Sequence, residues 1–177
     1  NPTLTVQNVT LSLDANGNAT LTEADAVVSK GDNCTTPDIT LPSGEQVELN
    51  AWRILPANFN PEKKYPVLLS IYGGPGSQEV TNSWGGFNLM WFQMLANELD
   101  IIVASVDNHG TDGRSEEFKK STYGQMGKLE TRDQAEAALE LAKRPYINGD
   151  RLGVFGWSYG GYMASNCLFQ SPEVFKM

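Results

Sequence analysis

The stretch from Leu152 to Gly160 reads Leu-Gly-Val-Phe-Gly-Trp-Ser-Tyr-Gly, and it decides the fold. Its first four residues are mostly apolar, which is typical of a short strand buried in a parallel sheet. The next five match the pattern G-x-S-x-G, with Gly156, Ser158 and Gly160 at the fixed positions. Residues 160–169 can form a helix, so the motif lies where a strand turns into a helix. Such a turn would bring the Ser158 hydroxyl to the carboxyl edge of the sheet, beside a helix N-terminus that favours developing negative charge.

The two glycines of the motif have a steric role in this prediction. In a turn this sharp the serine adopts a strained backbone conformation, and the chain passes close to its neighbours. We expect a Cβ atom at Gly156 or Gly160 to collide with the adjacent strand or helix. The alternative is a plain glycine-rich turn in which Ser158 only caps the helix.

Alternating strands and helices surround the motif. Two further apolar runs of strand length lie at residues 67–72 and 101–106. The segment from Glu130 to Lys143 is rich in Ala, Leu and Glu, with Thr131 and Gln134 at capping-box spacing. An earlier helix is indicated by one apolar stripe, made of Phe87, Met90, Trp91, Met94 and Leu95. The pattern predicts an α/β fold, a mostly parallel sheet with flanking helices.

A glycine-rich loop follows the first buried strand. It reads Tyr72-Gly-Gly-Pro-Gly76. In hydrolases with a G-x-S-x-G turn, this loop supplies one of two donors that stabilise a tetrahedral oxyanion. The other donor would be the backbone N–H of Tyr159, the residue after the serine. A simple Pro-Gly turn is the alternative interpretation of the loop.

The N-terminal part reads as β structure. Asn16-Gly17 is a hairpin signal after the alternating pair Leu11 and Leu13. A second hairpin is predicted from Ile39 to Ala51, around the turn Pro42-Ser-Gly-Glu.

Three segments together resemble the prolyl oligopeptidase family of serine peptidases, and within it the dipeptidyl peptidase IV-like branch. They are Lys64-Tyr-Pro-Val, Tyr72-Gly-Gly-Pro-Gly-Ser-Gln78 and Gly156-Trp-Ser-Tyr-Gly-Gly-Tyr162. The resemblance implies an α/β-hydrolase fold, of which residues 39–177 would be the N-terminal part of the peptidase domain. Residues 1–38 would be the end of a β-propeller and its connector.

The same resemblance assigns roles to individual residues. It makes Ser158 the nucleophile and places the Tyr72 hydroxyl beside the Tyr159 N–H in the oxyanion hole. The implied activity is release of N-terminal Xaa-Pro or Xaa-Ala dipeptides by acyl transfer. Trp157 and Tyr162 are secondary candidates for substrate contact, although packing beside the elbow or in the helix core is the simpler interpretation of each.

One loop departs from the family pattern. Relatives carry a glycine- and arginine-rich turn after the second buried strand, whereas residues 107–114 read Asp-Asn-His-Gly-Thr-Asp-Gly-Arg. His109 is the only histidine, but it precedes Ser158, and in this fold the catalytic histidine follows the serine. We therefore interpret His109 as a hydrogen-bonded surface residue. Asp107, Asp112 and Arg114 are expected to form a structural loop network.

The triad aspartate and histidine are not found after the serine. Only 19 residues follow Ser158, and they include neither Asp nor His. The chain also opens at Asn1 without Met and stops at Met177, so we expect it to be part of a longer protein. A serine without a base is a poor nucleophile, so this chain alone is predicted to be inactive.

Two other activities remain open beside the dipeptidase. The first is an acylaminoacyl peptidase or a carboxylesterase with the same elbow. The second is an inactive homologue that serves as an interaction domain; retention of Ser158 and Tyr72 argues against it.

Composition excludes several classes of protein. The net charge is −8 with a pI near 4.6, which argues against nucleic-acid binding. No apolar run approaches the roughly 20 residues of a membrane span. We expect no cofactor and no metal, because no His, Cys or acidic cluster has ligand spacing. Cys167 reads as a buried apolar residue, and Cys34 lies in the connector.

The expected partners are a peptide substrate, the missing propeller and C-terminal catalytic half of the same polypeptide, and a second copy of the longer protein. Sequons at Asn8, Asn18 and Asn33 suit an extracytoplasmic location, periplasmic, secreted or on the cell surface.

Overall fold

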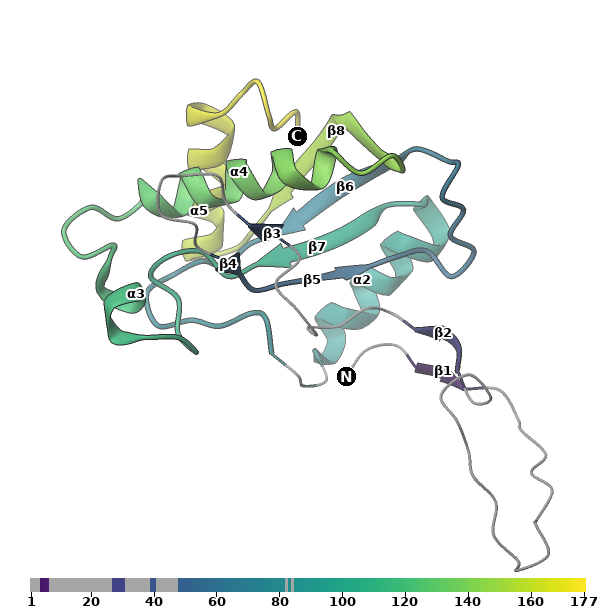
Figure 1. The fold of residues 1–177 in the computed structure, drawn as a ribbon, viewed down its shortest axis with the longest axis horizontal. Coiled ribbons are helices and arrows are strands. Elements are labelled where there is room, and N and C mark those ends of the chain that lie inside the picture. The colour runs from purple at the N-terminus through teal and green to yellow at the C-terminus, as the bar shows by residue number, and fades with distance from the viewer. Residues whose placement is uncertain (1–3, 7–26, 31–38, 41–47, 82, 84) are drawn as a thin grey trace, which may run out of the picture.

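The computed structural model describes residues 4–6, 27–30, 39–40 and 48–177, except positions 82 and 84 (Figure 1). Two small antiparallel pairs lie toward the N-terminus: β1 (Leu4–Val6) with β2 (Val27–Lys30), and β3 (Ile39–Thr40) with β4 (Glu48–Leu49). The second pair confirms the predicted hairpin, because Ile39 lies opposite Leu49. The Asn16-Gly17 turn, the Pro42 turn, Cys34 and the three sequons fall outside the described residues.

Within the described residues, four strands form the main sheet in the order β5-β7-β6-β8. They are β5 (Ala51–Ile54), β6 (Tyr65–Ser70), β7 (Ile102–Val106) and β8 (Ile147–Phe155). β6 pairs in parallel with both β7 and β8, whereas β5 is antiparallel to β7. The three predicted strands and the mostly parallel sheet are confirmed. β8 begins at Ile147 rather than at the predicted Leu152.

Helices cover both faces of this sheet. The covering helices are α2 (Gly86–Leu99), α4 (Leu129–Ala142) and α5 (Tyr159–Gln170), and a short helix α3 (Glu116–Lys120) lies in the connection before α4. α2 contacts β5 and β7 on one face, whereas α4 and α5 contact β8 and each other on the other face (Figure 1). This is the layered arrangement that alternating strands and helices predict.

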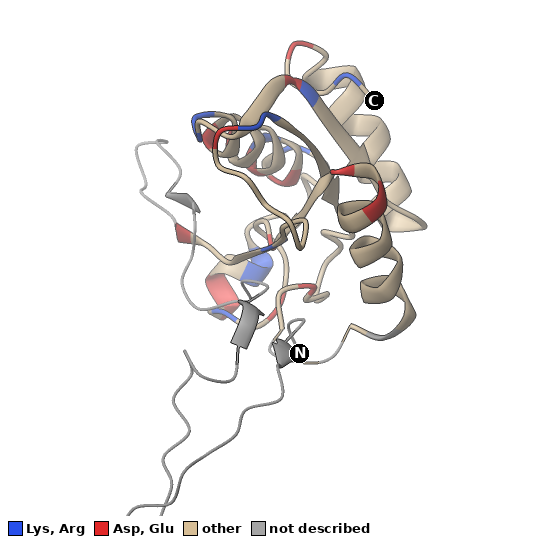
Figure 2. Ribbon diagram, turned by 90° about the vertical axis from the view of Figure 1, so that its right-hand side faces the viewer, with Lys and Arg blue, Asp and Glu red and all other residues tan. Residues whose placement is uncertain are grey.

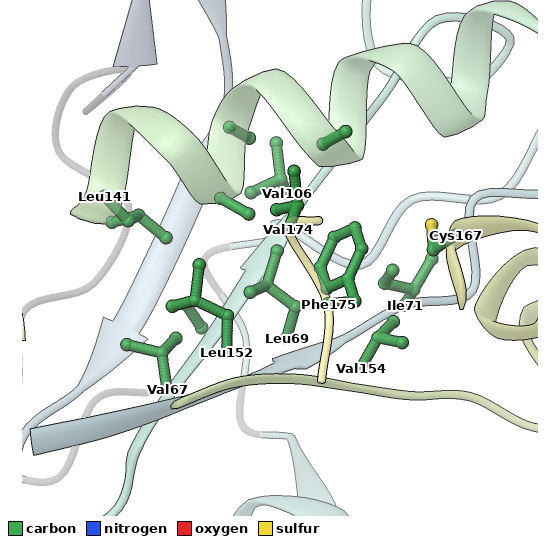
Figure 3. Packing of buried hydrophobic residues seen from close by; sticks show 14 of the residues in the cluster. Val67, Leu69, Ile71, Val106, Leu141, Leu152, Val154, Cys167, Val174 and Phe175 are labelled. Carbon is green, nitrogen blue, oxygen red and sulfur yellow. The ribbon is translucent and has the colours of Figure 1, made fainter. Parts of the chain in front are cut away.

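Alternate residues of each strand supply the two cores. Val67, Leu69 and Ile71 belong to the larger core beneath α4 and α5, where Figure 3 shows Leu69 beside Phe175 and Ile71 beside Cys167. Leu68, between two of them, packs against the smaller core under α2. This period of two is what a strand covered on both faces requires. Cys167 is fully buried, as predicted.

The apolar stripe predicted for α2 is not its buried face. Of the five predicted residues only Leu95 is buried, where it joins Phe92 and Ala96 against the sheet. The other four are exposed by 36% to 85%: Phe87, Met90, Trp91 and Met94. α2 is apolar on several sides and carries one charged residue, Glu98 (Figure 2). Periodicity therefore could not choose the buried face, which packing against β5 and β7 decided.

The last residues of the chain complete the larger core. Val174 and Phe175 are buried beneath α4 (Figure 3). Lys176 N–H donates to the Leu152 carbonyl at 2.8 Å, and the Met177 carbonyl accepts from Val154 N–H at 2.7 Å. The outer edge of β8 is thus paired at these two positions, which reduces the exposed edge that an unpaired strand would offer.

Candidate active site

Ser158 lies in a strained turn between β8 and α5. Its φ is 55° and its ψ is −123°, values that a residue with a Cβ atom rarely adopts. Among the described non-glycine residues, only Asp100 shares a positive φ. The side chain of Ser158 is exposed, and α5 begins at the next residue, Tyr159. A strained, exposed serine between a buried strand and a helix is the geometry of a nucleophile elbow.

The two flanking glycines permit this turn, as predicted. A Cβ atom at Gly156 would overlap the Gly160 carbonyl group and would lie 2.6 Å from the Ile71 carbonyl oxygen. A Cβ atom at Gly160 would overlap the same Ile71 oxygen. The start of α5 therefore packs directly against the backbone at the end of β6.

The glycine-rich loop after β6 brings Tyr72 next to Tyr159. The centroids of the two rings are 6.2 Å apart, and their planes are tilted by 38°. Gly74 lies against both rings, since a Cβ atom there would be 2.8 Å from Tyr72 Cε1 and 3.2 Å from Tyr159 Cδ1. Gly73 and Gly76 both have positive φ, which glycine adopts without strain. Two of the predicted site residues, distant in the sequence, therefore lie side by side.

A second loop, after β7, fixes the first. The Asp107 carboxyl group accepts the backbone N–H groups of Glu79 at 2.9 Å and Val80 at 3.1 Å. The Asn108 side-chain amide donates to the Gly73 carbonyl at 3.1 Å. Burial raises the pKa of Asp107 to about 6, although the two N–H donors act in the opposite direction. Asp107 is thus a structural anchor of the glycine-rich loop.

The rest of this loop is also a structural network, as predicted. Asp112 forms an ion pair with Lys119 at 3.1 Å, and its backbone N–H donates to the Ser77 carbonyl at 2.7 Å. The Arg114 guanidinium donates to the Glu48 carbonyl and lies 4.6 Å from the Phe118 ring centroid.

His109 is held by an aspartate from α4. Its ring nitrogen Nδ1 is 2.6 Å from Asp133 Oδ2, and its backbone N–H donates to the same oxygen at 2.8 Å. The ring stacks on Phe118 with centroids 4.6 Å apart. The predicted hydrogen bonding is confirmed, but the predicted surface position is wrong, because only 12% of the His109 side chain is exposed.

The first two turns of α4 carry a buried polar stripe that the sequence analysis missed. Glu130, Asp133 and Gln134 are all fully buried, at helical spacing i, i+3 and i+4. Gln134 Nε2 donates to the Val106 carbonyl and to Asn108 Oδ1, both at 2.9 Å. The signal in the sequence was a set of acidic and amide residues on one face of an otherwise alanine- and leucine-rich helix.

The predicted capping box is wrong. α4 begins at Leu129, so Thr131 already lies within the helix, where its hydroxyl donates to the Gly127 carbonyl at 2.8 Å. Gln134 is occupied with the loop after β7, as described above. The predicted helix itself is confirmed.

Glu130 connects α4 to the elbow. One carboxyl oxygen accepts the Gly127 N–H at 2.8 Å, and the other accepts the Tyr159 hydroxyl at 3.2 Å. Burial, and then the charge and hydrogen bond of Glu130, raise the pKa of Tyr159. The Tyr159 ring therefore has a fixed partner at its far end.

Tyr162 is not in the helix core, so that interpretation is wrong, whereas the packing of Trp157 beside the elbow stays a prediction. Trp157 is 67% exposed and Tyr162 is 45% exposed. The Tyr162 hydroxyl donates to the Met126 carbonyl at 3.4 Å, and its ring meets that of Tyr159 edge-on at 5.3 Å. Substrate contact by either side chain remains a prediction.

None of the described helices is both long and apolar enough to cross a bilayer. No group of three or more His, Cys, Asp or Glu side chains in the described ranges is placed to hold a metal ion.

The mostly parallel sheet, the strained serine and the glycine-rich loop define an α/β-hydrolase. The family model described as the prolyl oligopeptidase family matches residues 87–177. The chain belongs to this family, as its motifs predicted.

Individual relatives agree with this assignment. The chain is 41% identical over 145 residues to a protein of Aspergillus flavus named "Probable dipeptidyl peptidase 4", with 82% of the chain and 18% of the relative covered. It is 40% identical over 161 residues to dipeptidyl peptidase 4 of Trichophyton equinum, with 88% and 20% covered. The crystal structure of Porphyromonas gingivalis dipeptidyl peptidase 4 is similar with a TM-score of 0.70 and 39% identity, covering 78% of this chain and 19% of that one. The chain thus spans about a fifth of the length of these relatives.

Proposed function

We propose that the protein containing this chain is a serine peptidase that removes N-terminal dipeptides with Pro or Ala in the second position. The observation that carries the proposal is the strained, exposed Ser158 at the end of β8. The names of the relatives support the dipeptide specificity, because each is a dipeptidyl peptidase 4.

The proposed reaction is acyl transfer through Ser158. Its Oγ attacks the carbonyl carbon of the scissile bond and loses its proton to a histidine base. The tetrahedral oxyanion accepts hydrogen bonds from the Tyr159 N–H and the Tyr72 hydroxyl. Collapse expels the shortened peptide as an amine, which takes the proton, and leaves a dipeptidyl ester on Ser158. Water then hydrolyses the ester by the same steps.

We place the catalytic base outside this chain. His109 precedes Ser158, whereas in this fold the catalytic histidine follows the serine, and the His109 ring stacks on Phe118. The base and its acid partner would then come from the remaining polypeptide, as would the β-propeller. In this proposal residues 39–177 are the N-terminal part of the peptidase domain, and residues 1–38 are the end of the propeller and its connector.

The wider setting is also part of the proposal. A peptide is the substrate, and the longer protein forms a homodimer outside the cytoplasm. The sequons at Asn8, Asn18 and Asn33 support that location.

Hydrolysis by the full-length protein tests the activity. We expect release of the chromophore from an Ala-Pro anilide, and much slower release from an acetyl-Ala anilide. Ser158→Ala should abolish turnover and labelling by a fluorophosphonate. The matched control is Ser165→Ala, an exposed serine in α5 whose hydroxyl donates to the Gly161 carbonyl at 2.9 Å.

Each alternative gives a different result. Preference for the acetylated substrate would favour an acylaminoacyl peptidase or a carboxylesterase over the dipeptidase. A full-length protein that neither turns over substrate nor reacts with the fluorophosphonate would favour an inactive interaction domain. Rapid labelling of Ser158 in the isolated chain of 177 residues would contradict the requirement for a distant base.

A further inference from the structure

Glu130 is an acidic side chain with no exposed surface, and the proposed reaction does not use it directly. A buried carboxyl group is costly unless both of its oxygens have partners. Here both do: one accepts the Gly127 N–H at 2.8 Å and the other accepts the Tyr159 hydroxyl at 3.2 Å. The first partner belongs to the turn before α4, and the second to the residue directly after Ser158.

Tyr159 is therefore fixed at both ends. Its backbone follows the strained Ser158 and begins α5, and its hydroxyl is held by Glu130 on a different helix. Between these ends the ring packs on Gly74 and lies 6.2 Å from the ring of Tyr72. A change in the tilt of the Tyr159 ring would move either its own backbone or the loop that carries Tyr72.

The turn that presents Glu130 packs closely against α5. Gly127 has a φ of 84°, which favours glycine. The Tyr162 hydroxyl and the Asn166 side chain lie so close to Gly127 that an added Cβ atom would overlap the first and lie 2.9 Å from the second. Both of these side chains belong to α5. The residue that donates to the Glu130 carboxyl group thus lies directly against the helix that begins at the elbow.

We propose that Glu130 is a positioning residue for the oxyanion hole. Its hydrogen bond to the Tyr159 hydroxyl holds the Tyr159 N–H and the loop that carries Tyr72 in their positions relative to each other. The inference rests on the proposed function, and it adds to that function a group that never touches substrate. Stabilisation of the oxyanion depends on hydrogen-bond donors that are accurately placed before the reaction. A displacement of a donor by about 1 Å can lower the reaction rate about a hundredfold.

Three variants of the full-length protein test the inference by their kinetics on an Ala-Pro anilide. Glu130→Ala removes both hydrogen bonds, and we expect kcat to fall about tenfold to a hundredfold with KM within about threefold of wild type. Tyr159→Phe removes only the hydroxyl and should lower kcat in the same way, by a smaller factor. Glu130→Gln should retain most of the activity, because its amide oxygen can accept from Gly127 and its NH₂ can donate to the Tyr159 oxygen.

The double variant and a transition-state analogue separate positioning from loss of structure. Glu130→Ala combined with Tyr159→Phe should be no slower than Glu130→Ala alone, since both changes break the same link. Affinity for a dipeptide boronate, whose adduct with Ser158 carries the oxyanion-like charge, should fall by the same factor as kcat/KM. Affinity for the dipeptide product should be unchanged. The control is Glu140→Gln, in the last turn of the same helix, where the carboxyl group pairs with Lys143.

Unchanged kcat in Tyr159→Phe would overturn the inference, even if Glu130→Ala failed to fold. So would equal losses of boronate and product affinity, or fully additive losses in the double variant. If instead Ser158→Ala retained wild-type turnover, the proposed function would fail, whatever the result at Glu130.

Discussion

Replacing Gly160 by alanine adds one methyl group, and we expect this group to disturb the elbow. The added Cβ atom would overlap the Ile71 carbonyl oxygen and would lie 3.1 Å from both the Ile71 carbonyl carbon and Tyr72 Cα. These are backbone atoms at the end of β6, so no side chain can rotate away. The start of α5 must then move from β6 by on the order of 1 Å, because close-packed interiors have no space to absorb the methyl group.

The size of the effect follows from two opposing contributions. Overpacking of this kind costs about 1 to 3 kcal/mol of unfolding free energy. Alanine gains about 1 kcal/mol over glycine in a helix, so the net loss of unfolding free energy should be at most about 2 kcal/mol. The same displacement separates Ser158 and the Tyr159 N–H from Tyr72, and we expect kcat to fall about a hundredfold.

Gly161→Ala is the matched control, one residue further along the same helix. A Cβ atom there would have a single neighbour, the Gly156 carbonyl oxygen at 3.5 Å, which is ordinary contact. This variant should be as stable as wild type or more stable, with kcat nearly unchanged. The assays are thermal unfolding of the full-length protein and hydrolysis of an Ala-Pro anilide. Equal stability and equal kcat in the Gly160 and Gly161 variants would refute the steric account of the elbow.

Three further predictions concern stability and reactivity. Ser158→Gly should be about 1 kcal/mol more stable than Ser158→Ala in thermal unfolding, because only glycine is unstrained at a φ of 55°; a more stable alanine variant would contradict this. Burial raises the pKa of Asp107 to about 6 from 3.8, so the folded state binds this proton more tightly than the unfolded chain. The free energy of unfolding should therefore decrease as the pH rises from about 4 to about 6, and Asp107→Asn should lack this pH dependence in urea titrations. An unchanged pH dependence in the variant would show that another group causes it. Burial also raises the pKa of Cys167 to about 12, so a thiol reagent should label it only in denaturant; rapid labelling of the native protein would show that α5 opens.

Some parts of the site could be predicted from short stretches of sequence. The elbow could be recognised from the pattern around Ser158, because G-x-S-x-G between a strand and a helix is typical of a turn with one strained serine. The glycine-rich loop at Tyr72 could be placed near it because parallel strands present their carboxyl ends at one edge of a sheet. The structure brings these two segments together as predicted, with the Tyr72 and Tyr159 rings as neighbours.

Other features were missed or misplaced because they depend on partners far along the chain. The buried face of α2 was misassigned, since a helix that is apolar all round gives no unique stripe. His109 was expected at the surface, whereas Asp133, 24 residues away, holds it in the interior. Capping-box spacing suggested a local partner for Gln134, but its amide instead binds Asn108, 26 residues away.

The sequence by itself determined the α/β order and the position of the elbow, because strand and helix periodicity and the residue pattern of the turn involve only a few neighbouring residues. The tertiary structure alone decided what supports the elbow. Glu130 meets Tyr159 across 29 residues, and Asp107 meets Val80 across 27, because the sheet order sets these loops side by side. Buried polar groups must find partners wherever the fold places them, and no local pattern specifies which partners those are.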